Sequence, residues 1–205
     1  MATRRLDALH KSFHPRVTRF LAAVKASEID LLVYCTKRSS EESARLWRQG
    51  RTGRAISGKC QELAILACDV IDGTRQPTKK QIACSVVAGI TTPGPWEPVD
   101  KAVPTAVLQV ARYLHWQSWL INHVGPQHES PIVTNALPGE SAHNHGLAFD
   151  CVPIVHGKLA WNAGPLWDKL GGIAAEHQIE WSGTWTSFVE KVHFQLPNWR
   201  GLGNG

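Results

Sequence analysis

Apolar residues recur at helical spacing near the start of the chain. Between residues 15 and 27 they fall at i, i+3, i+4 and i+7, which predicts an amphipathic helix; the residues are Val17, Phe20, Leu21 and Val24. A second helix is predicted between Ser39 or Ser40, either of which can cap its N-terminus, and Gly50, which can end it. The short run Ile29–Tyr34 lies between these helices. Because it is rich in Ile, Leu and Val, it favours a buried strand.

The middle of the chain predicts helices and few strands. Helical apolar stripes cover 60–71, 79–90 and 105–124. A turn-rich stretch, TTPGPWEPVDKAVP, separates the second stripe from the third. Aromatic residues widen the third stripe, so we expect that helix to be buried on more than one side. These helices form a predicted insertion at about 53–131, which can serve as a wall-binding lobe, a lid or a packing element.

Strand signals return after Pro131. They are found at Ile132–Thr134, Leu147–Val152, Ile179–Ser182 and Val192–Leu196, with one helix predicted at Pro165–His177. Helices followed by strands, with one helix among them, are typical of an α+β fold with an antiparallel sheet. We therefore predict a single domain over 1–205, in which helices flank a small antiparallel sheet and the helical segment is inserted.

Composition and charge narrow the class of protein. The chain is 43% hydrophobic and 19% charged, as globular proteins are, and its 205 residues suffice for one well-buried domain. A net charge of +5 gives weak attraction to polyanions such as an anionic cell surface. No basic run is interleaved with aromatic residues, so nucleic acid is not expected as a partner. No segment approaches the roughly 18 to 20 apolar residues of a membrane span, so we expect no stable membrane insertion.

The N-terminal residues and the cysteines bear on the compartment. The first residues lack the apolar stretch of a secretory signal, so we expect synthesis in a host cytoplasm without a signal peptide. The five cysteines are an odd number without CxxC spacing. They are interpreted as small, reduced core residues.

The segment SAHNHGLAFD, residues 141–150, carries the first candidate metal ligands. His143 and Asp150 are seven residues apart, and an odd separation puts two side chains on opposite faces of a flat strand. A turn at Asn144–Gly146 allows His143 to come from the turn and Asp150 from the strand that follows, so that both reach one point. The pair alone is also compatible with a structural hydrogen bond. As metal ligands, an imidazole and a carboxylate suit Zn²⁺, which in catalytic sites has three protein ligands.

The third ligand is expected near the end of the chain, in EKVHFQL. His193 lies at the start of a predicted strand, and Glu190 precedes it by three residues. Glu190 is the natural general base, which takes a proton from the attacking water and later delivers it to the leaving amine. The odd spacing requires Glu190 to lie in the turn before the strand. His143, Asp150 and His193 are thus the predicted ligands of one zinc ion, while His145 is expected to pack or to support them.

These motifs resemble the LAS/VanY-type zinc peptidase family, which comprises D-Ala-D-Ala carboxypeptidases, D-Ala-D-Ala dipeptidases and phage L-alanyl-D-glutamate endopeptidases. Its SxHxxGxAxD signature stands intact as Ser141, His143, Gly146, Ala148 and Asp150, and its closing carboxylate-x-x-His element matches Glu190 and His193. Residues 36–39 and 46–52 resemble the family segment whose arginine stabilises the substrate carbonyl. The resemblance gives this role to Arg38.

The resemblance also implies residues that contact the substrate. Segment 179–185 resembles the family strand that precedes the closing element, and Trp181 and Trp185 are its candidates for the wall of a cleft. Ser141 is expected to orient the metal loop or the substrate. Two departures from the family reduce what it says about specificity: His145 stands where the family often has an aromatic residue, and roughly 75 residues are inserted between Thr52 and Thr134.

The function implied by this family is hydrolysis of peptidoglycan stem peptides. The chain's small size and the lack of a signal favour a monomeric phage endolysin that cuts the L-Ala-D-Glu bond after release by a holin. A D-Ala-D-Ala carboxypeptidase or dipeptidase is the alternative with the same chemistry. A non-catalytic wall-binding protein on the same fold is the alternative of another class. Glu190 and Arg38 argue against the last, because a purely structural zinc needs neither.

Overall fold

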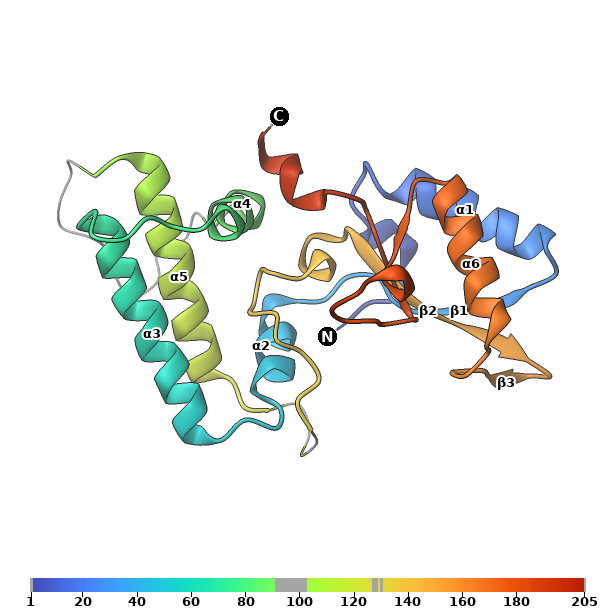
Figure 1. The fold of residues 1–205 in the computed structure, drawn as a ribbon, viewed down its shortest axis with the longest axis horizontal. Coiled ribbons are helices and arrows are strands. Elements are labelled where there is room, and N and C mark those ends of the chain that lie inside the picture. The colour runs from blue at the N-terminus through green and yellow to red at the C-terminus, as the bar shows by residue number, and fades with distance from the viewer. Residues whose placement is uncertain (1, 91–102, 127–128, 130, 205) are drawn as a thin grey trace. The chain divides into compact units, whose positions relative to one another are not determined.

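The computed structural model describes residues 2–90, 103–126, 129 and 131–204 (Figure 1). The turn-rich stretch predicted at 91–104 lies mostly outside them. The chain forms two compact units, one from residues 1–38 and 142–199, the other from residues 39–141 and 200–205. The predicted helical insertion belongs to the second unit, which also includes the helix before it. No helix in the described ranges is both long and apolar enough to cross a membrane.

The first unit is built on a small antiparallel sheet, as predicted for an α+β fold. Its strands are β1 (Asp30–Cys35), β2 (Ala148–Val155), β3 (Lys158–Leu159), β4 (Glu180–Trp181) and β5 (His193–Gln195). They are ordered β1-β2-β5-β4, with β3 paired to β2. The central pair is therefore β2 and β5, two strands that are distant in sequence.

One face of this sheet is a core of aromatic rings. Phe149, Phe194 and Trp181 are register partners across β2, β5 and β4, with ring centroids 5.2 Å and 6.2 Å apart. Helix α1 (His14–Ala26) places Phe20 within 5.6 Å of both phenylalanine rings, and α6 (Pro165–Glu176) packs Gly171 against Trp181. Because strand residues alternate between faces, the neighbours of these aromatics point to the opposite side of the sheet.

The second unit is helical. It contains α2 (Ser40–Arg48), α3 (Gly53–Ile71), α4 (Lys79–Ala88) and α5 (Thr105–His123), and α3 and α5 lie side by side (Figure 1). Its core joins α2, α3 and α5, as their apolar stripes predict. Side chains of Ser39, Thr52 and Thr78 each accept a hydrogen bond from the backbone N–H three residues on. The cap at Thr52 explains why α3 begins at Gly53, although the apolar stripe that predicted this helix begins only at residue 60.

The strand predicted at Ile132–Thr134 is wrong, because this segment has no strand pairing. Its backbone carbonyls are bound by side chains instead. Gln49 Nε2 donates to the carbonyl of Pro131 at 3.3 Å, and Arg51 Nη2 donates to the carbonyl of Thr134 at 2.9 Å. The β-branched residues of this run therefore favour an extended backbone, but no neighbouring strand among the described residues pairs with it.

Candidate metal centre

The sheet of the first unit places three side chains that can bind a metal in one row. Asp150 on β2 is the register partner of Cys35 on β1 and of His193 on β5. Directly opposed residues of neighbouring strands point to the same face, so these three side chains lie on the face away from the aromatic core. His143 joins them from the 3-10 helix η2 (Ala142–His145), which comes just before β2.

Two imidazole nitrogens and one carboxylate oxygen converge at this point. His143 Nε2 lies 3.0 Å from Asp150 Oδ1 and 3.1 Å from His193 Nδ1, and the last two atoms are 3.1 Å apart. The three side chains are only 2%, 7% and 10% exposed for His143, Asp150 and His193. The residues predicted as zinc ligands are therefore brought together, although they lie in separate parts of the sequence.

No placement of protons satisfies this triangle of atoms. A ring nitrogen either donates or accepts, and an ionised carboxylate only accepts. If one nitrogen carries a proton, the other two atoms are both acceptors; if both nitrogens carry one, they are both donors. A cation between three lone pairs removes the conflict, and two imidazoles with a carboxylate are a known ligand set of catalytic zinc. The residues present thus fit a zinc ion.

The electrostatics of the cluster keep Asp150 ionised. Burial would raise the pKa of Asp150, but the charges and hydrogen bonds of the two imidazoles outweigh it and hold that pKa below its usual range. Burial lowers the pKa of His143, against the opposing effect of Asp150. For His193 burial also acts downward, yet its hydrogen bond to Asp150 and that residue's charge raise the pKa overall. Asp150 is therefore an ionised carboxylate between two imidazoles.

The loop that carries His143 is fixed by a close backbone approach. Gly146 has φ of +68°, and a Cβ there would lie 2.7 Å from the carbonyl oxygen of Ala8. Only glycine fits both conditions. The same loop holds Arg38, because Arg38 N donates to the carbonyl of His143 at 3.0 Å and Asn144 Nδ2 donates to the carbonyl of Arg38 at 3.1 Å.

Arg38 lies beside Asp150 at the edge of the cluster, and its role in stabilising the substrate carbonyl stays a prediction. Its Nη2 is 3.6 Å from Asp150 Oδ2, and its side chain is 21% exposed. Its Nε is buried, and within the described part of the chain it has no hydrogen-bond partner. A buried N–H without a hydrogen-bond partner carries a desolvation cost, which a bound acceptor would remove.

Glu190 lies in the turn before β5, which agrees with the position predicted from its spacing. The hydroxyl of Ser182 binds the carbonyls of Glu190 and His193, and the indole N–H of Trp181 donates to the carbonyl of Lys191 at 2.7 Å. The Glu190 side chain is exposed to solvent. Desolvation by the surrounding protein nevertheless raises the pKa of its carboxyl; His193 and Arg38 oppose this rise, and the charge of Asp150 adds to it. A carboxylate with a raised pKa is the better proton acceptor.

The three predicted substrate-binding residues differ in their placement. Trp181 is 8% exposed, and a Cβ added at Gly171 or Gly183 would meet its ring at 2.2 Å or 2.1 Å, so the structure places it in the core and not on a cleft wall. Trp185 is half-buried, and its ring centroid lies 5.8 Å from that of His193. Ser141 is the residue at which the second unit ends before η2. For Trp185 and Ser141 a role in substrate binding stays a prediction.

Comparison with known proteins identifies the segment that carries this cluster. Residues 134–196 match the family model described as D-alanyl-D-alanine carboxypeptidase. The resemblance to this peptidase family is confirmed. The chain is also 29% identical over 109 residues to the peptidoglycan L-alanyl-D-glutamate endopeptidase CwlK of Bacillus subtilis (strain 168). That match covers 48% of this chain and 65% of the relative, so the chain spans just under two-thirds of the relative's length.

Sequence reasoning missed Cys35. The sequence predicts a reduced core cysteine at this position, but its Sγ lies 3.6 Å from His143 Nδ1 and 3.8 Å from Arg38 Nη2. Cys35, His143 and Asp150 also form a group whose ligand atoms all lie within 4.8 Å of one another. The signal for Cys35 was its place at the end of a predicted strand three residues before Arg38. Cys35 lies in the cluster because it is the register partner of Asp150, and the sequence does not specify this register.

Sequence reasoning also missed Gln195 and Glu180. His193 Nε2 lies 3.2 Å from Gln195 Oε1, and Gln195 Nε2 donates to Glu180 Oε2 at 3.0 Å. Gln195 could have been found, since it follows His193 by two residues on a strand and so shares its face. Glu180 gives no such signal, because it is set opposite Gln195 only by the pairing of β4 with β5.

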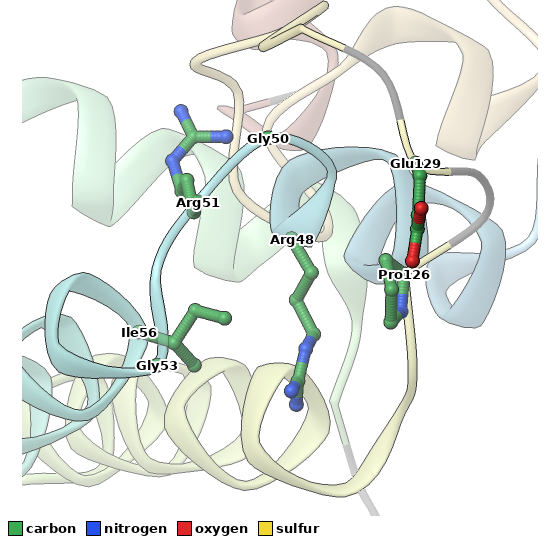
Figure 2. Close-up of a pocket in the computed structure, with 7 residues that line it drawn as sticks. All are labelled: Arg48, Gly50, Arg51, Gly53, Ile56, Pro126 and Glu129. Atoms are coloured by element: carbon green, nitrogen blue, oxygen red, sulfur yellow. The ribbon is translucent and has the colours of Figure 1, made fainter.

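A separate pocket of about 390 Å³ lies in the second unit (Figure 2). It is lined by Arg48, Gly50, Arg51, Gly53, Ile56, Pro126 and Glu129. Both guanidinium groups are used within the unit: Arg48 Nη1 donates to the carbonyl of Ile121 at 2.8 Å, and Arg51 binds the carbonyls of Trp47 and Thr134. These bonds join the end of α2 to α5 and to the segment after it, so the two cations belong to the scaffold.

Proposed function

We propose that this chain is a zinc-dependent peptidase that hydrolyses the stem peptides of bacterial peptidoglycan. The observation that carries the proposal is the convergence of His143, Asp150 and His193, with Glu190 and Arg38 beside them. A structural zinc site would need neither a carboxylate of raised pKa nor a cationic side chain with a free N–H. The match to a peptidase family over residues 134–196 supports the same conclusion.

The chemistry follows from the roles of these side chains. A zinc ion held by His143, Asp150 and His193 would supply Lewis acidity, which polarises a carbonyl group and makes water more acidic. Glu190 accepts the proton of the attacking water as the new C–O bond forms, and it returns a proton to the amine nitrogen as the C–N bond breaks. Arg38 donates hydrogen bonds to the carbonyl oxygen as negative charge develops there.

The bond that we propose for cleavage is L-Ala-D-Glu. It is supported by the name of the similar Bacillus subtilis protein, a peptidoglycan L-alanyl-D-glutamate endopeptidase. An endolysin that reaches the wall through a holin is the proposed biological setting. The description of the matching family model, D-alanyl-D-alanine carboxypeptidase, favours the second candidate, which is removal or cleavage of D-Ala-D-Ala ends.

Digestion of purified peptidoglycan, followed by mass spectrometry of the products, tests the proposal. New amino ends on D-Glu support the endopeptidase, whereas released D-Ala or D-Ala-D-Ala supports the second candidate. An unchanged wall, with zinc bound to the protein, contradicts both and favours a wall-binding protein.

A matched pair of variants tests the mechanism. Glu190→Gln keeps the shape of the side chain and removes its basicity, so it should retain zinc and lose activity by about 10²- to 10⁴-fold. Glu176→Gln makes the same change at an exposed position of α6 and should leave activity unaltered. Full activity of Glu190→Gln would refute the assignment of the general base.

A further inference from the structure

The side of His193 that faces away from the proposed metal is tied to a chain of hydrogen bonds. Trp185 Nε1 donates to Glu180 Oε1 at 2.7 Å, Gln195 Nε2 donates to Glu180 Oε2 at 3.0 Å, and Gln195 Oε1 lies 3.2 Å from His193 Nε2. Glu180 and Gln195 are register partners on β4 and β5. We propose that Glu180 is a positioning residue that acts through Gln195 to hold His193 with its Nδ1 lone pair free for zinc. The inference rests on the zinc site of the proposed function.

The direction of every bond in this chain follows from one carboxylate. An indole N–H only donates and an ionised carboxylate only accepts, so Glu180 uses one oxygen for Trp185 and the other for Gln195. The Gln195 amide must therefore turn its NH₂ group toward Glu180 and its oxygen toward His193. An amide oxygen only accepts, so His193 Nε2 carries the proton.

The consequence appears on the other side of the ring. A neutral imidazole has one N–H, so a proton on Nε2 leaves a lone pair on Nδ1. Nδ1 is the atom that lies 3.1 Å from both His143 Nε2 and Asp150 Oδ1. Metal-binding histidines are commonly oriented by such a partner on the distal nitrogen, and loss of the partner typically weakens metal binding 10- to 100-fold.

Glu180 is required because the Gln195 amide has no preferred orientation of its own. An amide at position 180 cannot accept from both Trp185 and Gln195. If Gln195 then turns over, its NH₂ group faces His193 Nε2, and the ring proton moves to Nδ1, where it competes with the metal. Gln195 itself is 8% exposed, so water does not readily replace the lost partner.

Three variants of the full-length protein test this series of hydrogen bonds. The quantity measured is the zinc affinity, in competition with a chromophoric chelator. Glu180→Gln should weaken zinc binding about tenfold. The double variant Glu180→Gln with Gln195→Glu exchanges amide and carboxylate and should restore binding to within a few-fold of wild type. In it the new carboxylate accepts directly from His193, and the new amide accepts from Trp185 while it donates to position 195. Glu176→Gln is the control for loss of one negative charge and should bind zinc as wild type does.

Nitrogen-15 NMR of the His193 ring gives a readout that a merely structural role would not change. In the metal-free wild-type protein, at a pH that leaves the His193 ring neutral, the ring should carry its proton on Nε2. In metal-free Glu180→Gln the tautomer with the proton on Nδ1 should also be populated. Unchanged zinc affinity in Glu180→Gln, or a wild-type proton on Nδ1, would overturn the inference. The wild-type measurement needs no variant to fold. Failure of the proposed function is a different result, namely a wild-type protein that leaves peptidoglycan intact.

Discussion

Two adjacent glycines in α6 should respond in opposite directions to the same substitution. A Cβ at Gly171 would lie 2.2 Å from Cε3 of Trp181, far closer than van der Waals contact, whereas a Cβ at Gly172 would meet no atom within 4 Å. Both residues lie inside the helix Pro165–Glu176. The pair therefore separates helix propensity from packing against Trp181.

The magnitudes follow from three contributions. Alanine in place of glycine inside a helix stabilises by about 0.5–1 kcal/mol, which is the whole effect expected for Gly172→Ala. In Gly171→Ala the gain is opposed by overpacking of about 1–3 kcal/mol. Displacement of Trp181 also weakens its hydrogen bond to the carbonyl of Lys191, which contributes about 1 kcal/mol. We expect Gly171→Ala to lose about 2 kcal/mol.

Urea unfolding, followed by far-UV circular dichroism, measures both changes as shifts in midpoint at a constant slope. The midpoint should rise for Gly172→Ala and fall for Gly171→Ala. Gly171→Ala should also bind zinc more weakly, since Trp181 holds the turn that leads into His193. If both substitutions raise the midpoint equally, Trp181 does not pack against α6 as described, and it does not hold the turn that leads into His193.

Gly146→Ala should cost more stability than Gly157→Ala, because both positions have positive φ but only the first also brings a Cβ to 2.7 Å from the carbonyl oxygen of Ala8; equal unfolding midpoints would contradict this. The strain shared by both is about 1 kcal/mol. Asp150→Asn should lower zinc affinity by more than about 100-fold, beyond the loss expected for an outer partner. It should also lower the pKa of His193 in the metal-free protein, which NMR titration measures, since the Asp150 charge raises that pKa. Because zinc needs the unprotonated ring, the raised pKa of His193 means that zinc affinity should already fall as pH drops towards the ordinary histidine pKa of about 6.5, and a zinc affinity by equilibrium dialysis that stays constant down to that pH would count against the raised pKa. The folding stability of the metal-free protein depends on pH through the same two groups. The raised folded-state pKa of His193 contributes stability that is present below the unfolded-state pKa of histidine and is lost as pH rises through the folded-state value. The lowered pKa of Asp150 contributes stability that is lost at acid pH, so the stability should be greatest between the pKa of Asp150 and that of His193.

Local pattern determined most of the helices, because a helix is stabilised within its own segment. The stripes at 15–27 and 105–124 became α1 and α5, and of the two predicted caps, Ser39 and Ser40, the structure uses Ser39 for α2. The same local logic failed at Ile132–Thr134. A strand exists only when another strand pairs with it, and here the side chains of Gln49 and Arg51 take the carbonyls instead.

Some residues of the candidate site could likewise be predicted from local sequence, and others could not. Motif spacing and family resemblance were enough to name His143, Asp150, His193 and Glu190 as candidates. Each belongs to a short motif whose residue types indicate metal binding or proton transfer. Which further side chains contact them was decided by strand register alone. Cys35 reaches the cluster because β1 pairs with β2, and Glu180 reaches His193 through the pairing of β4 with β5. Register depends on contacts between segments far apart in the chain, so no local pattern of residues encodes it, and only the tertiary structure sets Glu180 behind His193.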